Sequence, residues 1–214
     1  MPRRRAVATS NEIGLFEAIY TMRAIRDFKP DPVPDDLLRK VIEAAGQAPS
    51  GGNRQPWKFI VIRGQQGKDK VAELVRIGQD RRPAAGNRPT GTAAPVADFA
   101  GLLRAAPVLI IVCAIKPATE GPQTVGPFGQ TFPAIQNLLL AARGLGLGGT
   151  ITTSFREMER EFREYLRIPD NLTPTCLIPL GYPSGAGRNK HGRKSRLPVE
   201  EIAFEEKVGQ RISF

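Results

Sequence analysis

Residues 107–115, "PVLIIVCAI", form an unbroken apolar run that is rich in β-branched side chains. The run has the length of a strand and falls well short of the roughly 18 to 20 residues that a helix needs to span a bilayer. Because no polar residue alternates with the apolar ones, we expect a strand that is buried on both faces and lies centrally in a sheet. Helices then have to cover both faces of that sheet.

Segments with helical periodicity lie on both sides of this strand in the sequence, and two further apolar runs are typical of strands. The expected helices are 13–20, 34–45, 67–78, 132–149 and 154–168, and the expected strands are 58–62 and 173–183. Ser154 and Glu157 form a capping-box pattern at the start of the last helix. Residues 200–206 are expected to be extended. The pattern predicts an α+β or α/β architecture with helices around one sheet.

The length of 214 residues suits a single domain with one sizeable core. We expect a flexible basic tail at 1–10, followed by one domain at 11–214. Two stretches, 78–95 and 116–131, are rich in Gly, Pro and small polar residues and match neither periodicity. Long irregular loops in a compact domain are usually either mobile lids or disordered, and either stretch is a candidate border of a site.

The net charge of +10 and the pI near 10.1 raise nucleic acid as a partner. Basic residues gather near the N-terminus, near residues 81–88 and at 188–196. Aromatic residues do not alternate with them as they do in a groove that stacks bases. A small ligand that carries phosphate accounts for the basic clusters as naturally, so nucleic acid is not the partner we expect.

Cysteine and histidine are too sparse for a metal cluster. Cys113 and Cys176 each lie in an apolar, strand-like run, which predicts buried, reduced thiols. His191, the only histidine, lies in a polar stretch and is expected to be a solvated loop residue. No apolar run could cross a bilayer, and no apolar segment follows the basic start as in a secretory signal, so we expect a cytoplasmic protein without membrane contact.

The chain also lacks the common catalytic motifs, such as a serine elbow, a zinc-protease helix or a phosphate-cradling P-loop. The glycine-rich run at 144–149 follows a helix and precedes a strand, which is the opposite of the order in a dinucleotide fingerprint. We interpret it as a helix stop with close backbone approach. An enzyme without acid or base side chains has to take its reactivity from a cofactor.

Residues 46–57, "GQAPSGGNRQPW", contain more backbone-breaking, polar and aromatic residues than a turn needs. Glycines allow another group to approach the backbone closely. This composition favours a loop that holds a ligand.

Several motifs together resemble the nitroreductase family of FMN-dependent oxidoreductases. They occur in the family's order and cover nearly the whole chain. They are "MRAIRDFKPDPVP" at 22–34, "APSGGNRQPW" at 48–57, "KFIVI" at 58–62, "QNLLLAARGLGLGG" at 136–149, "TITTSF" at 150–155, "IPLGYP" at 178–183 and "GRKSRLP" at 192–198. The resemblance implies an α+β fold, in the form of an α/β sandwich whose mostly antiparallel sheet is wrapped by helices. It also implies a homodimer with two flavins at the interface.

The resemblance also assigns cofactor-binding residues, and none of them is a catalytic acid, base or metal ligand. Basic residues of the first and last motifs, with Ala24 beside them, are implied to bind the FMN phosphate. Guanidinium groups suit phosphate because they offer forked, permanently charged donors. The implied phosphate ligands are Arg23, Arg26, Lys194 and Arg196. The loop that lies against the flavin of the other subunit supplies Pro49, Ser50, Gly51 and Asn53, and the backbone along the reactive flavin edge supplies Ile151, Thr152 and Thr153.

The first motif departs from the family at two positions. Relatives often carry Arg and Ser where this chain has Met22 and Ala24, so one cation and one hydroxyl are missing from the expected phosphate site. Either the affinity for FMN is lower, or Arg188 and Lys190 compensate.

The activity implied by the resemblance is a ping-pong cycle. NAD(P)H delivers hydride to FMN, and a small-molecule acceptor such as a nitroaromatic, a quinone or an activated alkene then takes it. The resemblance leaves the choice between NADPH and NADH open. The alternatives are other chemistry on the same flavin scaffold, namely dehalogenation, flavin fragmentation or enone reduction, and a basic protein that binds nucleic acid or senses flavin without turnover.

Overall fold

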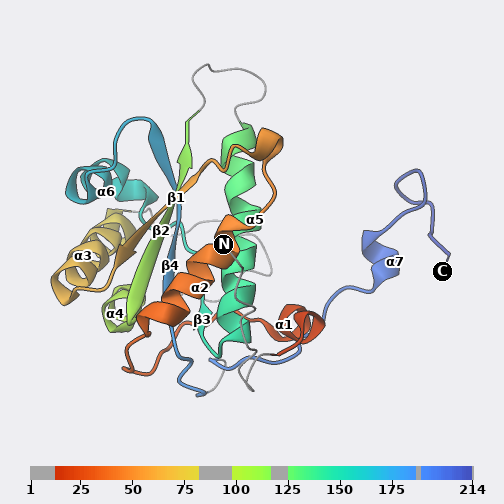
Figure 1. Cartoon of the computed structure of the whole chain (residues 1–214), viewed down its shortest axis with the longest axis horizontal. Coiled ribbons are helices and arrows are strands. Elements are labelled where there is room, and N and C mark those ends of the chain that lie inside the picture. The colour runs from red at the N-terminus through yellow and green to blue at the C-terminus, as the bar shows by residue number, and fades with distance from the viewer. Residues whose placement is uncertain (1–12, 82–97, 117–124, 187–188, 214) are drawn as a thin grey trace, which may run out of the picture.

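The computed structural model describes residues 13–81, 98–116, 125–186 and 189–213 (Figure 1). Its centre is a four-stranded sheet with the order β1-β2-β4-β3, and every neighbouring pair is antiparallel. The strands are β1 (Trp57–Ile62), β2 (Val108–Ile115), β3 (Gly148–Gly149) and β4 (Leu172–Gly181). The antiparallel sheet expected from the resemblance is confirmed.

The strand β2 is buried from Val108 to Ala114, as its unbroken apolar run predicts. Alternate side chains point to opposite faces of the sheet. Leu109, Ile111 and Cys113 therefore join one core cluster, whereas Val108 and Ile110 join the other. Two cores on the two faces of one sheet make the molecule a three-layer sandwich.

Helices cover both faces (Figure 1). The cluster with Leu109 lies under α3, α4 and α6, and the cluster with Val108 lies under α2 and α5. The bounds of these helices are α2 (Asp35–Gly46), α3 (Gln65–Arg81), α4 (Phe99–Ala105), α5 (Val125–Gly144) and α6 (Glu159–Leu166). The remaining elements are α1 (Leu15–Thr21), α7 (Val199–Ile202) and two short 3₁₀ turns, η1 (Gly51–Asn53) and η2 (Arg156–Met158).

Both stretches expected to be irregular are helical in part. The helix α3 continues to Arg81, and α5 begins at Val125 rather than at residue 132. Pro127 lies in the first turn of α5, where a backbone N–H has no helical partner in any case, so proline is tolerated there. Residues 82–95 and 117–124 of these stretches, and the expected tail at 1–10, lie outside the described residues.

Three smaller expectations were wrong. The Ser154 hydroxyl forms a hydrogen bond of 2.8 Å with the Thr152 hydroxyl, and the 3₁₀ turn that precedes α6 starts only at Arg156, so Ser154 does not cap a helix. Residues 199–202 form a helical turn where an extended segment was expected. The helix α4 was not expected at all, although the Asp98 side chain caps it by accepting from the Gly101 N–H at 2.6 Å.

The two cysteines are free and buried, as expected. Burial raises the pKa of Cys113 to about 11 and that of Cys176 to about 12, so both thiols stay protonated at neutral pH. Among the described residues, no helix has the length and apolar character needed to cross a bilayer.

Candidate functional site

The first predicted motif lies along the edge of the sheet at β3. Ala24 forms a parallel bridge with Gly149, and the Ile25 N–H donates to the Gly149 carbonyl at 3.0 Å. Ile25 is fully buried and anchors the segment. Arg23 and Arg26 flank this anchor and remain partly or fully exposed.

The last predicted motif returns to the same edge. The Arg26 N–H donates to the Asn189 side-chain oxygen at 3.0 Å, a contact between residues 163 positions apart. The Gly192 N–H donates to the Thr21 carbonyl at 2.9 Å. These bonds hold residues 189–192 against residues 21–26.

The two segments border one cavity of about 460 Å³, a size typical of small-ligand sites. Its lining residues are Met22, Arg23, Ala24, Arg26, Gln136, Leu139, Gly149, Thr150, Ile151, Lys194 and Arg196. The structure thus brings together all four basic residues predicted to bind phosphate, together with Ala24 and Ile151. None of the four cations forms an ion pair with a described carboxylate. Their charge is therefore available to an anionic ligand, and a phosphate monoester fits this donor set.

Glycine is required where β3 borders the cavity. A Cβ atom on Gly149 would lie 2.7 Å from the Pro179 carbonyl oxygen, and one on Gly148 would overlap the Ile25 side chain. The glycine-rich run therefore allows close backbone packing after α5, as predicted, and Gly146 with φ of 75° supplies the helix stop.

The backbone at 151–153 continues along the same edge. The Thr152 N–H and carbonyl both bond to Leu177 of β4, each at 2.9 Å. Because successive N–H groups of an extended chain point to opposite sides, those of Ile151 and Thr153 point away from β4. Ile151 is 40% exposed and lines the cavity, whereas Thr152 and Thr153 do not line it.

The predicted loop at 49–53 lies apart from this cavity in the single chain. The Gly51 N–H donates to the Gln130 side-chain oxygen at 2.9 Å, which fixes the loop to α5. Pro49, Gly51 and Asn53 are exposed, and Ser50 accepts a hydrogen bond of 3.0 Å from the Gln55 N–H. Asn53 has φ of 54°, a left-handed conformation that asparagine tolerates better than most residues. Its contact with a partner's flavin stays a prediction.

His191 is half-buried, so the expectation of a solvated loop residue was wrong. Its Nε2 atom lies 2.9 Å from the Leu147 carbonyl oxygen, which can only accept, so Nε2 carries the proton. Its Nδ1 atom is buried and has no hydrogen-bond partner. Burial lowers the pKa of His191, and the charges of Arg143 and Arg23 lower it further. The sequence around His191, which lies between Lys190 and Gly192, contains no signal that predicts its packing against Leu147.

Several lining residues were not singled out from the sequence, chiefly Gln136 and Leu139 of α5 and Thr150. Gln136 could have been found because it is one of few polar side chains in an otherwise apolar helical run. Arg188, which was expected as a possible compensating cation, lies outside the described residues, and Lys190 is described but does not line the cavity.

An antiparallel α+β sandwich with a cationic cavity at its sheet edge suits the class of oxidoreductases that work through a bound phosphate-bearing cofactor. The model of the nitroreductase family matches residues 19–182. The chain belongs to this family and is an oxidoreductase of it.

Individual relatives agree with this assignment. A protein of Methanothermobacter thermautotrophicus assigned as an NADH dehydrogenase/NAD(P)H nitroreductase is 32% identical over 177 residues, which cover 81% of this chain and 80% of that protein. Iodotyrosine deiodinase 1 of Rattus norvegicus is 31% identical over 183 residues, 79% of this chain and 62% of that protein. The crystal structure of a nitroreductase family protein from Clostridium novyi NT is similar in fold, with a TM-score of 0.65 and 24% identity over 93% of this chain and 97% of that one.

Proposed function

We propose that this protein is an FMN-dependent oxidoreductase that uses NAD(P)H to reduce small oxidised acceptors, with nitroaromatics and quinones as the first candidates. The observation that carries the proposal is the cavity beside β3, where four cations without a described carboxylate partner face one space. Such a cluster suits the dianionic phosphate of FMN. Bound FMN would supply a two-electron redox centre that accepts hydride from NAD(P)H and passes it to the acceptor.

Each group of site residues then has its own task. Arg23, Arg26, Lys194 and Arg196 hold the phosphate through charge-assisted hydrogen bonds. The N–H groups of Ile151 and Thr153 would stabilise negative charge on the ring of a bound flavin. The exposed loop with Asn53 closes the site from the second subunit.

We also propose that the enzyme is a homodimer. Leu15, Phe16, Ile19 and Tyr20 of α1 are each at least 43% exposed, as is Ile202 of α7. In Figure 1, α7 and the segment that follows it project away from the rest of the chain. Apolar surface on a projecting segment is costly unless a partner covers it.

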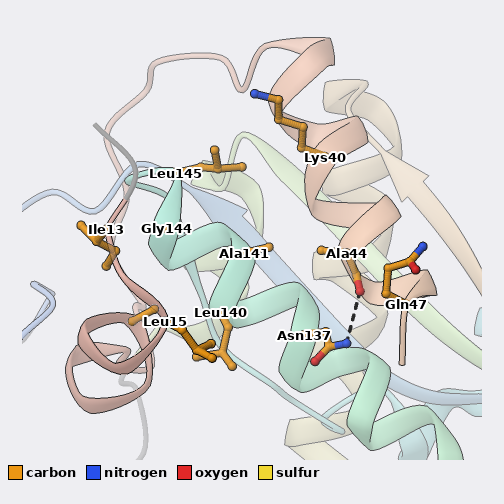
Figure 2. A pocket seen from close by; sticks show the side chains of 11 residues that line it. Ile13, Leu15, Lys40, Ala44, Gln47, Asn137, Leu140, Ala141, Gly144 and Leu145 are labelled. Carbon is orange, nitrogen blue, oxygen red and sulfur yellow. Dashed lines mark hydrogen bonds between the residues drawn. The ribbon is translucent and has the colours of Figure 1, made fainter. Parts of the chain in front are cut away.

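An apolar groove beside α1 provides a place for that partner. Figure 2 shows the groove between α1, α2 and α5, with Leu15 and Leu140 beside each other. The Asn137 side chain donates a hydrogen bond of 3.3 Å to the Ala44 carbonyl and so joins α5 to α2. Its volume is about 540 Å³. We assign the groove to the second copy of the chain, whose α7 segment offers Leu197, Val199 and Ile202 as matching apolar side chains.

Two measurements on purified protein test the activity. Mass spectrometry of the cofactor that heat releases should identify FMN, and anaerobic addition of NADH or NADPH should bleach the flavin absorbance. FAD, or a failure to bind any flavin after reconstitution, would contradict the proposal. DNA binding by a protein whose flavin is not bleached would favour the alternative of a basic binding protein.

Reductive dehalogenation is a second candidate, because iodotyrosine deiodinase 1 of Rattus norvegicus is similar to most of this chain. In that reaction an aryl halide and NAD(P)H would yield the arene, halide ion and NAD(P)⁺. Halide release from an iodophenol, measured beside the reduction of a quinone, separates the two activities.

A further inference from the structure

A small aromatic surface lies on α5, nearer the N-terminal end of the helix than the cavity-lining residue Gln136. The Phe128 and Phe132 rings lie 5.8 Å apart between centroids at an angle of 58°. The guanidinium carbon of Arg156 lies 5.8 Å from the centroid of Phe128. Phe132 is 40% exposed and Arg156 is also exposed, so the surface combines accessible aromatic area with a positive charge at its edge.

The surface is continuous with elements that line the candidate flavin site. Phe132 lies four residues before Gln136 on α5, so both side chains lie on one face of the helix, and Gln136 lines the cavity. The Arg156 N–H donates to the Thr153 carbonyl at 3.1 Å, which ties the guanidinium-bearing turn to the backbone at 151–153. Because the backbone at 151–153 is the expected neighbour of the flavin ring, a molecule held at Arg156 would lie near that backbone.

Arg156 differs from the arginines that follow it. Arg160 lies 3.2 Å from Glu161 and 3.6 Å from Glu164, and Arg163 donates to the Leu172 and Pro169 carbonyls. For Arg156, no ion pair with a described carboxylate is present, and its described side-chain contact is the Phe128 ring. Its charge is thus available to a ligand.

We propose that Phe128, Phe132 and Arg156 bind the electron acceptor and select planar aromatic acceptors that carry an anionic group such as a carboxylate. The inference rests on the proposed function as a flavin-dependent reductase. The aromatic rings stack against the plane of the acceptor, and the guanidinium fork pairs with its carboxylate. The overall positive charge of the chain adds to the attraction of anions over neutral molecules.

Two nitro acceptors of nearly the same shape test the selection, namely 4-nitrobenzoate and its neutral amide, 4-nitrobenzamide. In each case one nitro group, one NAD(P)H and one proton yield the nitroso compound, NAD(P)⁺ and water. Arg156→Gln should lower kcat/KM for 4-nitrobenzoate by about tenfold, mostly through KM, because a hydrogen bond to a charged group is lost at a partly solvated site. The kcat/KM of Arg156→Gln for 4-nitrobenzamide should stay within about twofold of the parent value. Arg156→Lys should keep part of the preference for 4-nitrobenzoate over 4-nitrobenzamide.

Binding provides a readout that does not depend on turnover. Calorimetric titration of the oxidised, FMN-loaded dimer with 4-nitrobenzoate should show the same loss of affinity in Arg156→Gln. Arg160→Gln is the matched control, because Arg160 is an exposed arginine one turn later whose charge is already paired, and it should leave both acceptors unchanged.

Three outcomes would overturn the inference. Equal losses for both acceptors would assign Arg156 a structural role between η2 and α5. Unchanged kcat/KM for both acceptors in Arg156→Gln would exclude charge selection by Arg156. If NAD(P)H bleaches the FMN but 4-nitrobenzoate does not bind, the inference is overturned and the proposed reductase activity stands. If NAD(P)H does not bleach the FMN, the proposed function itself is rejected.

Discussion

At the scale of single residues, Arg196 is the sharpest test of the phosphate site. Arg196→Ala should weaken FMN binding by about one to two orders of magnitude, because a hydrogen bond to a charged group contributes roughly 1.5 to 3 kcal/mol and 1.4 kcal/mol corresponds to a factor of ten. Fluorescence titration of the apoprotein with FMN measures the change. Arg39→Ala is a suitable control, because Arg39 is exposed, pairs with Glu43 on its own helix and does not line the cavity. Unchanged affinity in a folded Arg196→Ala protein would remove Arg196 from the site.

His191 makes the stability of the apoprotein depend on pH. Its folded-state pKa lies below the unfolded value, so between these two values the unfolded chain binds more protons. The free energy of unfolding should therefore fall as the pH drops below about 6.5, the ordinary pKa of histidine. Burial is the largest cause of the lowered pKa; the Leu147 carbonyl opposes it, and the charges of Arg143 and Arg23 add to it.

Urea unfolding at a series of pH values measures the effect. His191→Gln can still donate to the Leu147 carbonyl but cannot take up a proton, so its stability should vary less between pH 5 and pH 7, where histidine ordinarily titrates. If the free energy of unfolding depends on pH equally in both proteins, other groups cause the acid sensitivity.

At the scale of elements, β3 tolerates no side chain. Gly149→Ala would bring a Cβ atom within 2.7 Å of the Pro179 carbonyl, a backbone atom that cannot move aside alone. We expect a loss of about 1 to 3 kcal/mol in the free energy of unfolding, as is typical of overpacking. Gly46→Ala, at the end of α2 where a Cβ meets no atom within 4 Å, should be neutral or stabilising. Thermal unfolding measures the stability of both variants and of the parent. Equal midpoint temperatures for the two variants would contradict the steric explanation.

The sequence allowed elements with strong local signals to be predicted. The strand β2 was predictable because its apolar run has no alternation, and α2 was predictable because its apolar residues recur with helical spacing. The first turns of α5 were not, because Gly126, Pro127 and Gly129 break the helical pattern. Arg23 and Lys194 were named from their motifs, and Gln136 was missed although it is one of few polar side chains in an apolar helical run. The half-buried position of His191 depends on its contact with the Leu147 carbonyl, 44 residues away, which no local pattern records.

At the scale of the whole molecule, the projecting α7 segment predicts that the dimer depends on it. Val199→Asp combined with Ile202→Asp would place two charges where we expect an apolar groove of the partner, and burying unpaired charge is strongly unfavourable. Sedimentation should then show a monomer or a much weaker dimer, with reduced flavin content because the loop at 49–53 no longer reaches the partner's site.

Tyr165→Asp provides the control for that variant. Tyr165 is 40% exposed on α6, on the face of the sheet opposite to α2 and α5. This protein should sediment as the parent does. A flavin-loaded monomer of the double variant would contradict the shared site.

The hydrogen bonds that join residues 189–192 to Thr21 and Arg26 also mean that the cavity is completed by residues synthesised after the sheet. A nascent chain that ends before residue 189 contains Arg23 and Arg26 but lacks Lys194, Arg196 and the Asn189 side chain that accepts from the Arg26 N–H. The last strand, β4, ends at Gly181, so all four strands precede these residues in the chain. We therefore expect capture of the proposed cofactor only after translation past residue 196.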